Sequence, residues 1–268
     1  MEQKLAIIGA GNIGLAITRG LVKSCKVQPQ QVILTRRRTK NLAAFKDEGF
    51  HVTADNAEAL EFADLVLICV EPQHVDSLFV ELKPILKPGK HTIVSVVSGL
   101  ELAQLRQLCG DGIDIVRAMP NTATGIGASM TCLAADDPEG QAIVQVKAVF
   151  DLVGACLVIQ EEKMSSATAL AACGIAFFLR MIRAASQGGI EIGFHPETAL
   201  LMAAQTAKGA ASLLLEQNQH PEHEIDRVTT PRGCTIAGLN QMEHEGLSSA
   251  IIKGIVTSAT KADGLYKG

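Results

Sequence analysis

The chain has 268 residues, 47% of them hydrophobic and 19% charged, which is enough to bury a large core and to form two domains. Its net charge of −4 at pH 7 argues against a nucleic-acid or anionic-membrane partner, and only 3% of its residues are aromatic, too few for base-stacking surfaces. Seven cysteines stand singly without a Cys-x-x-Cys pair, so the sequence predicts no metal site, no disulfide framework and a reducing, cytoplasmic location.

Short runs of Val, Ile and Leu alternate with helix-like segments through the first part of the chain. The runs are apolar on both faces, as in the interior strands of a parallel sheet. Predicted strands lie at 4–8, 31–34, 65–70, 92–97, 113–117, 129–133 and 156–159, and predicted helices at 14–23, 40–48, 56–62 and 74–86. We therefore predict an α/β fold whose N-terminal domain, residues 1–160, is a doubly wound Rossmann sheet.

The first predicted strand is followed by Gly9-Ala10-Gly11-Asn12-Ile13-Gly14, which opens the first predicted helix. Glycines at this spacing permit a tight turn and the close approach of a pyrophosphate, and the helix N-terminus supplies N–H groups to it. A glycine-rich turn without a ligand is the alternative. The strand and helix on either side favour a dinucleotide bound by Gly9, Gly11, Asn12, Ile13 and Gly14.

The segment Thr35-Arg36-Arg37-Arg38-Thr39-Lys40 follows the second predicted strand. A chain that binds NAD places an acidic residue here for the ribose 2′-hydroxyl. Arginines can instead bind a 2′-phosphate through charge-assisted hydrogen bonds, although a solvated basic loop is the alternative. We predict that Thr35, Arg36 and Arg37 bind NADPH, with NADH as a weaker substitute.

Three further segments end predicted strands at their carboxyl edge, where ligands of open α/β sheets bind. They contain Val70 and Pro72, then Ser98, then the run 119–122, Met-Pro-Asn-Thr. Each alone is compatible with ordinary turn chemistry. Together they predict the cleft around the nicotinamide, with Val70, Pro72 and Ser98 as cofactor-binding residues.

After about residue 160 the strand signals end and Ala-rich helical patterns take over. Predicted helices lie at 165–188, from 196 onward, and at 221–227, 235–244 and 247–266. The uncharged segment 164–179 holds few large residues, which favours a buried helix over a membrane span. Because the helix at 165–188 is apolar around most of its circumference, it needs covering on all sides. We predict that residues 161–268 form an all-helical dimerisation domain that also supplies the substrate site.

The loop Thr230-Pro231-Arg232-Gly233-Cys234-Thr235 interrupts the helical pattern and leads directly into the predicted helix 235–244. Free N–H groups and the positive end of the helix dipole favour a carboxylate at such a position. The hydroxyls of Thr230 and Thr235 add hydrogen-bonding groups. A plain Thr N-cap after a proline turn is the alternative.

These segments resemble those of the Δ1-pyrroline-5-carboxylate reductases, and the resemblance covers essentially the whole chain. It rests on the glycine fingerprint, on Arg-Ala-Met-Pro-Asn-Thr at 117–122, on Ala-Ala-Gln-Thr at 203–206 and on the segment 228–239. The resemblance implies reduction of the cyclic imine 1-pyrroline-5-carboxylate to L-proline by NAD(P)H. It also implies a Rossmann domain, a helical dimerisation domain, and a homodimer or an assembly of dimers.

The resemblance also assigns roles to residues. Thr235 would hydrogen-bond the imine nitrogen, and Thr230, Gly233 and Cys234 would line the carboxylate pocket, reaching toward the cofactor of a partner subunit. Glu161 would lie near the ring nitrogen and Asn56 near the adenosine of the cofactor. A protonated imine is already an electrophile, so hydride delivery needs positioning rather than a strong acid.

Three departures from the usual motifs of the family leave other functions open. Arg232 stands where the family has glycine, which removes easy access to positive φ but offers a guanidinium to a carboxylate. Residues 171–176 read Ala-Ala-Cys-Gly-Ile-Ala for the usual Ser-Gly-Ser-Gly-Pro-Ala, and Glu71 replaces a lysine. The alternatives are a paralogue that reduces another cyclic imine, a 3-hydroxyacid dehydrogenase-like enzyme, and an NADPH-binding protein without catalysis. The long helix weighs against the dehydrogenase, because it offers no Lys or His.

Overall fold

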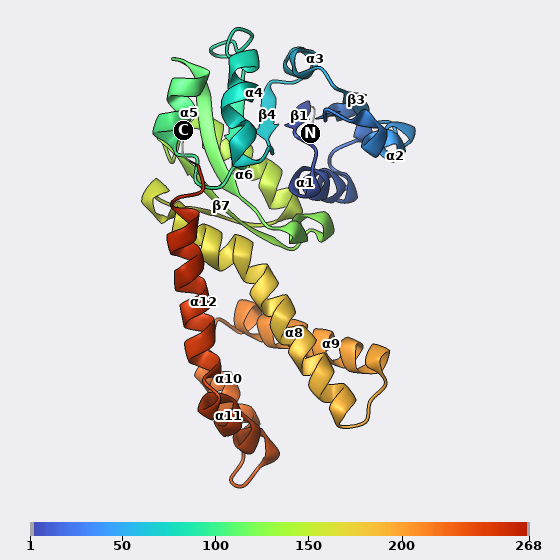
Figure 1. Ribbon diagram of the computed structural model, residues 1–268, viewed down its shortest axis with the longest axis vertical. Helices are drawn as coiled ribbons and strands as arrows, with labels where there is room; N and C mark the ends of the chain where they lie inside the picture. Colours follow the sequence, from blue (N-terminus) through green and yellow to red (C-terminus); the bar gives the residue numbers. More distant parts are fainter. Residues whose placement is uncertain (1–2, 267–268) are drawn as a thin grey trace. The chain divides into compact units, whose positions relative to one another are not determined.

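The computed structural model describes residues 3–266 and divides the chain into two compact units (Figure 1). The sheet unit runs to Cys173 and resumes at Val256, and the helical unit spans Gly174–Ile255. These divisions differ from the boundary predicted between residues 160 and 161, which stays a prediction.

The sheet unit is built on eight strands in the order β3-β2-β1-β4-β5-β6-β7-β8. Strands β1 to β6 pair in parallel, β7 runs antiparallel to β6, and β8 is parallel to β7. The strands are β1 Leu5–Ile8, β2 Val32–Thr35, β3 His51–Thr53, β4 Leu65–Ile68, β5 Thr92–Ser95, β6 Asp114–Met119, β7 Ser129–Ala135 and β8 Gly154–Val158. The strand order reverses at β1, so the carboxyl ends of β1 and β4 flank the crevice where Rossmann folds bind ligands. The predicted doubly wound fold is confirmed.

Alternate residues of the buried strands belong to two separate hydrophobic cores, one on each face of the sheet. Leu5 and Ile7 of β1 point to one face of the sheet, and Ala6 and Ile8 point to the other. The helices of the first face are α1 Asn12–Lys23, α2 Ala43–Asp47 and α6 Gln141–Phe150, and those of the second are α3 Asn56–Phe62, α4 Val75–Leu82 and α5 Leu102–Cys109. Because both faces are covered, the strands read as continuous apolar runs in the sequence.

Helices make up the rest of the chain. The short α7, Met164–Ala167, passes through a π-helix, Thr168–Cys173, into α8, Gly174–Glu191. The remaining helices are α9 Pro196–Gln217, α10 Pro221–Val228, α11 Cys234–His244 and α12 Leu247–Ala262. Helices α8 and α9 lie side by side (Figure 1). They can pack closely because Gly189 has no side chain: a Cβ at this position would lie only 3.0 Å from the Ala199 Cβ.

Several element predictions need correction. The edge strand β3 was not predicted, because it has only three residues and begins with an exposed histidine. The helices α5 and α6 were also missed. The single helix expected at 165–188 is broken by the π-helix, and the last helix ends at Ala262 rather than at residue 266.

Two helical stretches, Glu161–Glu191 and Pro196–Gln217, are long and apolar enough to pass as membrane spans by length and composition alone. Their mean hydropathies are 1.6 and 1.2, and few of their residues are buried within the chain. Large apolar side chains such as Leu170, Phe178, Leu201 and Leu215 are exposed there. These helices therefore need cover that the described residues of a single chain do not supply.

Candidate functional site: a dinucleotide cleft

The turn after β1 has the backbone geometry that the glycine fingerprint demands. Gly9 has φ +82°, and a Cβ placed on it would lie 2.6 Å from Val70 Cγ1 and 3.0 Å from the Val70 backbone nitrogen. Only glycine fits this conformation and this space. Gly11 is the N-cap of α1 and has no side chain to cap the first-turn N–H groups of the helix. The turn is therefore compatible with a pyrophosphate held at the start of α1.

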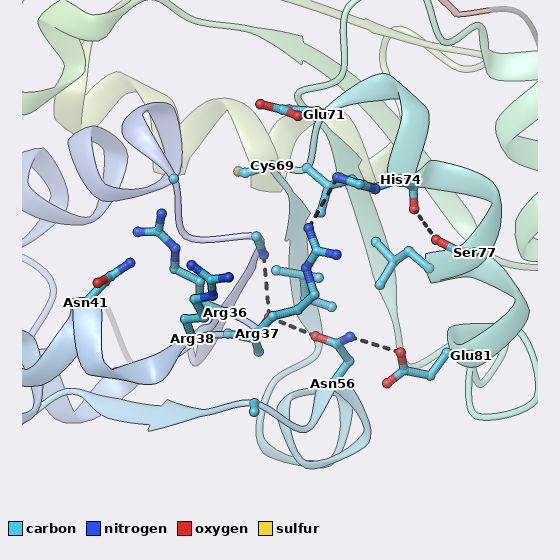
Figure 2. Close-up of a pocket in the computed structure, with 17 residues that line it drawn as sticks. Arg36, Arg37, Arg38, Asn41, Asn56, Cys69, Glu71, His74, Ser77 and Glu81 are labelled. Atoms are coloured by element: carbon cyan, nitrogen blue, oxygen red, sulfur yellow. Dashed lines mark hydrogen bonds between the residues drawn. The ribbon is translucent and has the colours of Figure 1, made fainter.

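A cavity of about 960 Å³ opens at the carboxyl ends of β1, β2 and β4. Figure 2 shows the side chains that line it, with the arginines from the end of β2 opposite the residues of α4. The lining includes seven of the predicted cofactor-binding residues, namely Gly9, Gly11, Thr35, Arg36, Arg37, Asn56 and Val70. The lining thus runs from the glycine turn after β1 to the arginines after β2.

The other predicted cofactor-binding residues lie outside the described lining of the cavity, namely Asn12, Ile13, Gly14, Pro72 and Ser98. The first three form the first turn of α1, and Gly14 packs against β1, where a Cβ would lie 2.9 Å from Ile7 Cγ2. Pro72 begins the 3-10 helix η3, Pro72–His74, and the Ser98 hydroxyl lies 3.9 Å from Met119 Sδ. Their roles toward a cofactor stay predictions.

A chain of hydrogen bonds fixes the polar floor of the cavity. The Thr35 hydroxyl donates to Asn56 Oδ1 at 2.8 Å, and Asn56 Nδ2 donates to Glu81 Oε2 at 3.1 Å. The same hydroxyl oxygen lies 3.4 Å from the Gly9 backbone nitrogen, which donates to it. Because Glu81 can only accept while it is ionised, it determines which way the Asn56 amide faces. Thr35 and Asn56 thus connect the glycine turn after β1 to Glu81 of α4.

The wall opposite β2 holds residues that were not predicted to be part of a site. Arg38, from the predicted basic segment, and Asn41 line the side that follows β2, whereas His74, Ser77, Leu78 and Glu81 come from η3 and α4. Most of these residues lie within or next to helices, whereas the sequence prediction considered residues at the ends of strands. Cys69 also lines the cavity, and burial raises the pKa of its thiol to about 12. That thiol is therefore neutral and acts as an apolar wall.

Glu161, in the segment after β8, is held by an ion pair with Arg117 of β6. Its Oε1 accepts a hydrogen bond from Arg117 Nη1 at 2.9 Å and from the backbone N–H of Leu102, the first residue of α5, at 2.6 Å. The Arg117 side chain is only 5% exposed. The Glu161 carboxylate thus neutralises a buried guanidinium and the N-terminus of a helix, and its predicted role near a substrate stays a prediction.

The loop between α10 and α11 forms a β-turn in the helical unit. The Gly233 N–H donates to the Thr230 carbonyl at 2.9 Å, with Pro231 and Arg232 as the central residues. Arg232 has φ +59°, the conformation that a type II turn requires at its third residue and that glycine adopts without strain. Helix α11 begins at Cys234, and Gly233 is its N-cap without a side-chain cap. Thr235 is half-buried in the first turn of α11, whereas Thr230 and Cys234 are exposed.

The described residues, 3–266, contain no group of three or more His, Cys, Asp or Glu side chains placed to hold a metal ion. The polar lining of the cavity includes the carboxylates of Glu71 and Glu81 and the imidazole of His74. The glycine turn and the end of β2 offer N–H groups, hydroxyls, amides and guanidinium groups. These are ligands for phosphates and carboxylates.

Three features define a two-domain, dinucleotide-dependent oxidoreductase. They are the Rossmann sheet, the arginine-lined cavity at its switch point, and the separate helical unit. Two family models match the chain: "NADP oxidoreductase coenzyme F420-dependent" over residues 4–99 and "Pyrroline-5-carboxylate reductase dimerisation" over residues 161–265. The chain belongs to the pyrroline-5-carboxylate reductase family. Pyrroline-5-carboxylate reductase 2 of Dictyostelium discoideum, 47% identical over 97% of this chain and 92% of its own length, establishes this membership.

Two other proteins are similar over the whole chain. Pyrroline-5-carboxylate reductase 1 of the same organism is 50% identical over 99% of this chain, which spans only 50% of that longer relative. The crystal structure of a Plasmodium falciparum pyrroline carboxylate reductase with NADP bound has a TM-score of 0.90 and 23% identity, covering 100% of both chains. The latter likeness concerns the fold.

Proposed function

We propose that this chain is a pyrroline-5-carboxylate reductase that reduces the cyclic imine 1-pyrroline-5-carboxylate to L-proline with NADPH. The observation that carries the proposal is the cavity at the β1–β4 switch point. It joins a glycine turn that admits no Cβ to the arginines at the end of β2. Membership of the family gives the substrate class, and the residues of the cavity give the cofactor.

NADPH supplies the hydride, and the residues of the cavity bind and orient the cofactor. The N–H groups at the start of α1 hold the pyrophosphate, because they have no acceptors within the helix. Arg36 and Arg37 bind the 2′-phosphate, and Asn56, fixed by Thr35 and Glu81, hydrogen-bonds the adenosine ribose. NADH lacks the group that the arginines bind, so it serves as a weaker substitute.

The substrate is held by the loop before α11, within the domain 161–268. Thr235 hydrogen-bonds the ring nitrogen, while the N–H groups of the first turn of α11, together with Thr230, Gly233 and Cys234, bind the carboxylate. Support comes from the uncapped start of α11, whose dipole favours an anion. The imine is protonated when it accepts the hydride, so the residues need only orient it and exclude water.

The active form is a homodimer or an assembly of dimers that works in the cytoplasm. The exposed apolar side chains of α8 and α9 need cover, and residues 161–265 match a family dimerisation domain. An interface between copies of the chain would bury these apolar faces, whose helices have mean hydropathies of 1.6 and 1.2.

The direct test is product formation. Purified protein is incubated with 1-pyrroline-5-carboxylate and NADPH, and proline is measured by chromatography against reactions that lack either the protein or the cofactor. Proline that forms only in the complete mixture supports the proposal. No proline from folded protein that binds NADPH would overturn the proposed activity and favour a cofactor-binding protein without this catalysis.

A further inference from the structure

Arg37 reaches across the adenosine end of the cavity to a histidine on the opposite wall. Its Nη2 lies 3.3 Å from Nε2 of His74, the last residue of η3. Figure 2 draws this contact as a dashed line. A guanidinium has donors only, so this contact requires the tautomer of His74 whose Nε2 is free to accept. The contact therefore connects the basic side of the cavity with the side formed by η3 and α4.

Three carboxylates lie on the same side of the cavity as His74, and each keeps its charge while it accepts a hydrogen bond from a neutral group. Asn56 donates to Glu81, the Gln73 amide donates to Glu71, and the hydroxyl of Tyr266 donates to Asp76. Three arginines follow β2, namely Arg36, Arg37 and Arg38. A cationic His74 cannot accept a hydrogen bond from Arg37 and is repelled by its guanidinium, so the histidine can gain charge only where an anion draws Arg37 away.

A 2′-phosphate is such an anion. It carries close to two negative charges near neutral pH, and it accepts several hydrogen bonds. When Arg37 donates to the phosphate, it leaves the ring nitrogen of His74 without its donor. An imidazole changes its charge between pH 5 and 8, so a proton from solvent can take the place of the guanidinium hydrogen.

We propose that His74 is a specificity-determining residue for NADPH, because it binds a proton when the cofactor binds and becomes a second cation facing the 2′-phosphate beside Arg37. The inference rests on the proposed cofactor. It adds that the binding of NADPH, but not of NADH, takes up a proton at His74. The selectivity for NADPH over NADH therefore increases as the pH falls toward 6.5.

The test measures binding rather than turnover. Isothermal titration of the wild-type protein with NADPH, in two buffers of different ionisation enthalpy at about pH 7, counts the protons taken up. The variant His74→Gln keeps an acceptor for Arg37 but cannot be charged, and His51→Gln removes a histidine that does not line the cavity. Dissociation constants for NADPH and NADH are also measured between about pH 8 and pH 6.5.

We expect proton uptake on NADPH binding in the wild type and in His51→Gln, and less in His74→Gln. The selectivity for NADPH at the lower pH should be about tenfold smaller in His74→Gln, the size of one charge-assisted hydrogen bond. Titration of the 2′-phosphate itself is common to all variants and cancels in the comparison. Equal proton uptake in the wild type and His74→Gln would overturn the inference and leave the cofactor assignment intact. Folded protein that binds no NADPH at any pH would overturn both.

Discussion

Arg117 Nη1 lies 2.9 Å from Glu161 Oε1, and this ion pair joins β6 to the segment that precedes α7. The resemblance to the reductase family assigns Glu161 to a substrate, whereas its contacts are structural: a buried guanidinium and the first N–H of α5. The two roles predict different consequences of mutation.

We expect Glu161→Gln to lower the free energy of unfolding by about 3 kcal/mol, because the Arg117 charge would remain buried without a counter-charge. Urea unfolding of the variant measures this loss, with Glu162→Gln, at an exposed neighbouring position, as the matched control. Unchanged stability, together with a large rise in KM for the imine, would show instead that Glu161 serves the substrate.

Arg232 occupies a backbone conformation that suits glycine, with φ +59°. Such a residue costs about 1 kcal/mol or more. Replacement by glycine should therefore give a more stable protein than replacement by alanine, by about 1 kcal/mol. Thermal unfolding of Arg232→Gly and Arg232→Ala compares the two, since both lack the guanidinium. Equal stability would mean that the turn is not strained.

The same pair of variants tests whether the guanidinium clamps the substrate carboxylate. If it does, both substitutions raise KM for the imine by a similar factor, about tenfold for one charge-assisted hydrogen bond. If glycine lowers KM while alanine does not, the backbone rather than the charge of Arg232 determines binding.

His91 makes the stability of the sheet unit sensitive to acid. The side chain is 2% exposed; its Nδ1 accepts the Lys87 N–H at 2.9 Å, and its Nε2 donates to the Leu60 carbonyl at 3.0 Å. Burial lowers the pKa of His91 from its ordinary value of 6.5. The unfolded chain therefore binds the proton first, and stability should be lost progressively as the pH falls below about 6.5.

The free energy of unfolding measured between pH 8 and pH 5.5 checks this dependence. The variant His91→Gln should be less stable at pH 8 and should lose less stability on acidification. The variant His51→Gln, at an exposed position, is the matched control. A pH profile that is identical in the wild type and His91→Gln would contradict the assignment.

Thr235→Ala should lower kcat strongly and leave the dissociation constant of NADPH nearly unchanged. The reason is that the hydroxyl is assigned to the ring nitrogen and not to the cofactor. Thr235→Ser retains the hydroxyl and should recover most of the turnover. Equal losses of turnover and NADPH affinity in the alanine variant would contradict the role given to Thr235.

Much of the fold follows from sequence because its signals are local. The glycine fingerprint and the apolar runs of β1, β2, β4 and β5 require no knowledge of distant contacts. The three-residue β3 could not be found in this way, because its pairing with β2 rather than its own pattern makes it a strand. The π-helix likewise has a contact that no local pattern indicates, because its Ala171 carbonyl accepts a hydrogen bond from the Asn121 amide of a distant loop.

The sequence predicted the part of the candidate site on the β1 turn and at the end of β2. It did not predict the part on η3 and α4. Nothing near His74 in the sequence indicates that Arg37 will reach it. Nor does any local pattern indicate that Glu81 orients the amide of Asn56. Such residues meet only because β4 and α4 fold beside β1 and β2.

The most direct test of the proposed function is the steady-state rate of NADPH oxidation with 1-pyrroline-5-carboxylate, measured beside the six-membered piperideine carboxylate and a substrate-free blank. We predict that kcat/KM for the five-membered ring clearly exceeds that for the six-membered ring, and that NADPH is preferred to NADH. No oxidation above the blank with the five-membered ring, by protein that binds NADPH, would contradict the assignment. Turnover of only the six-membered ring would identify a reductase whose altered turn at Arg232 accepts a different imine.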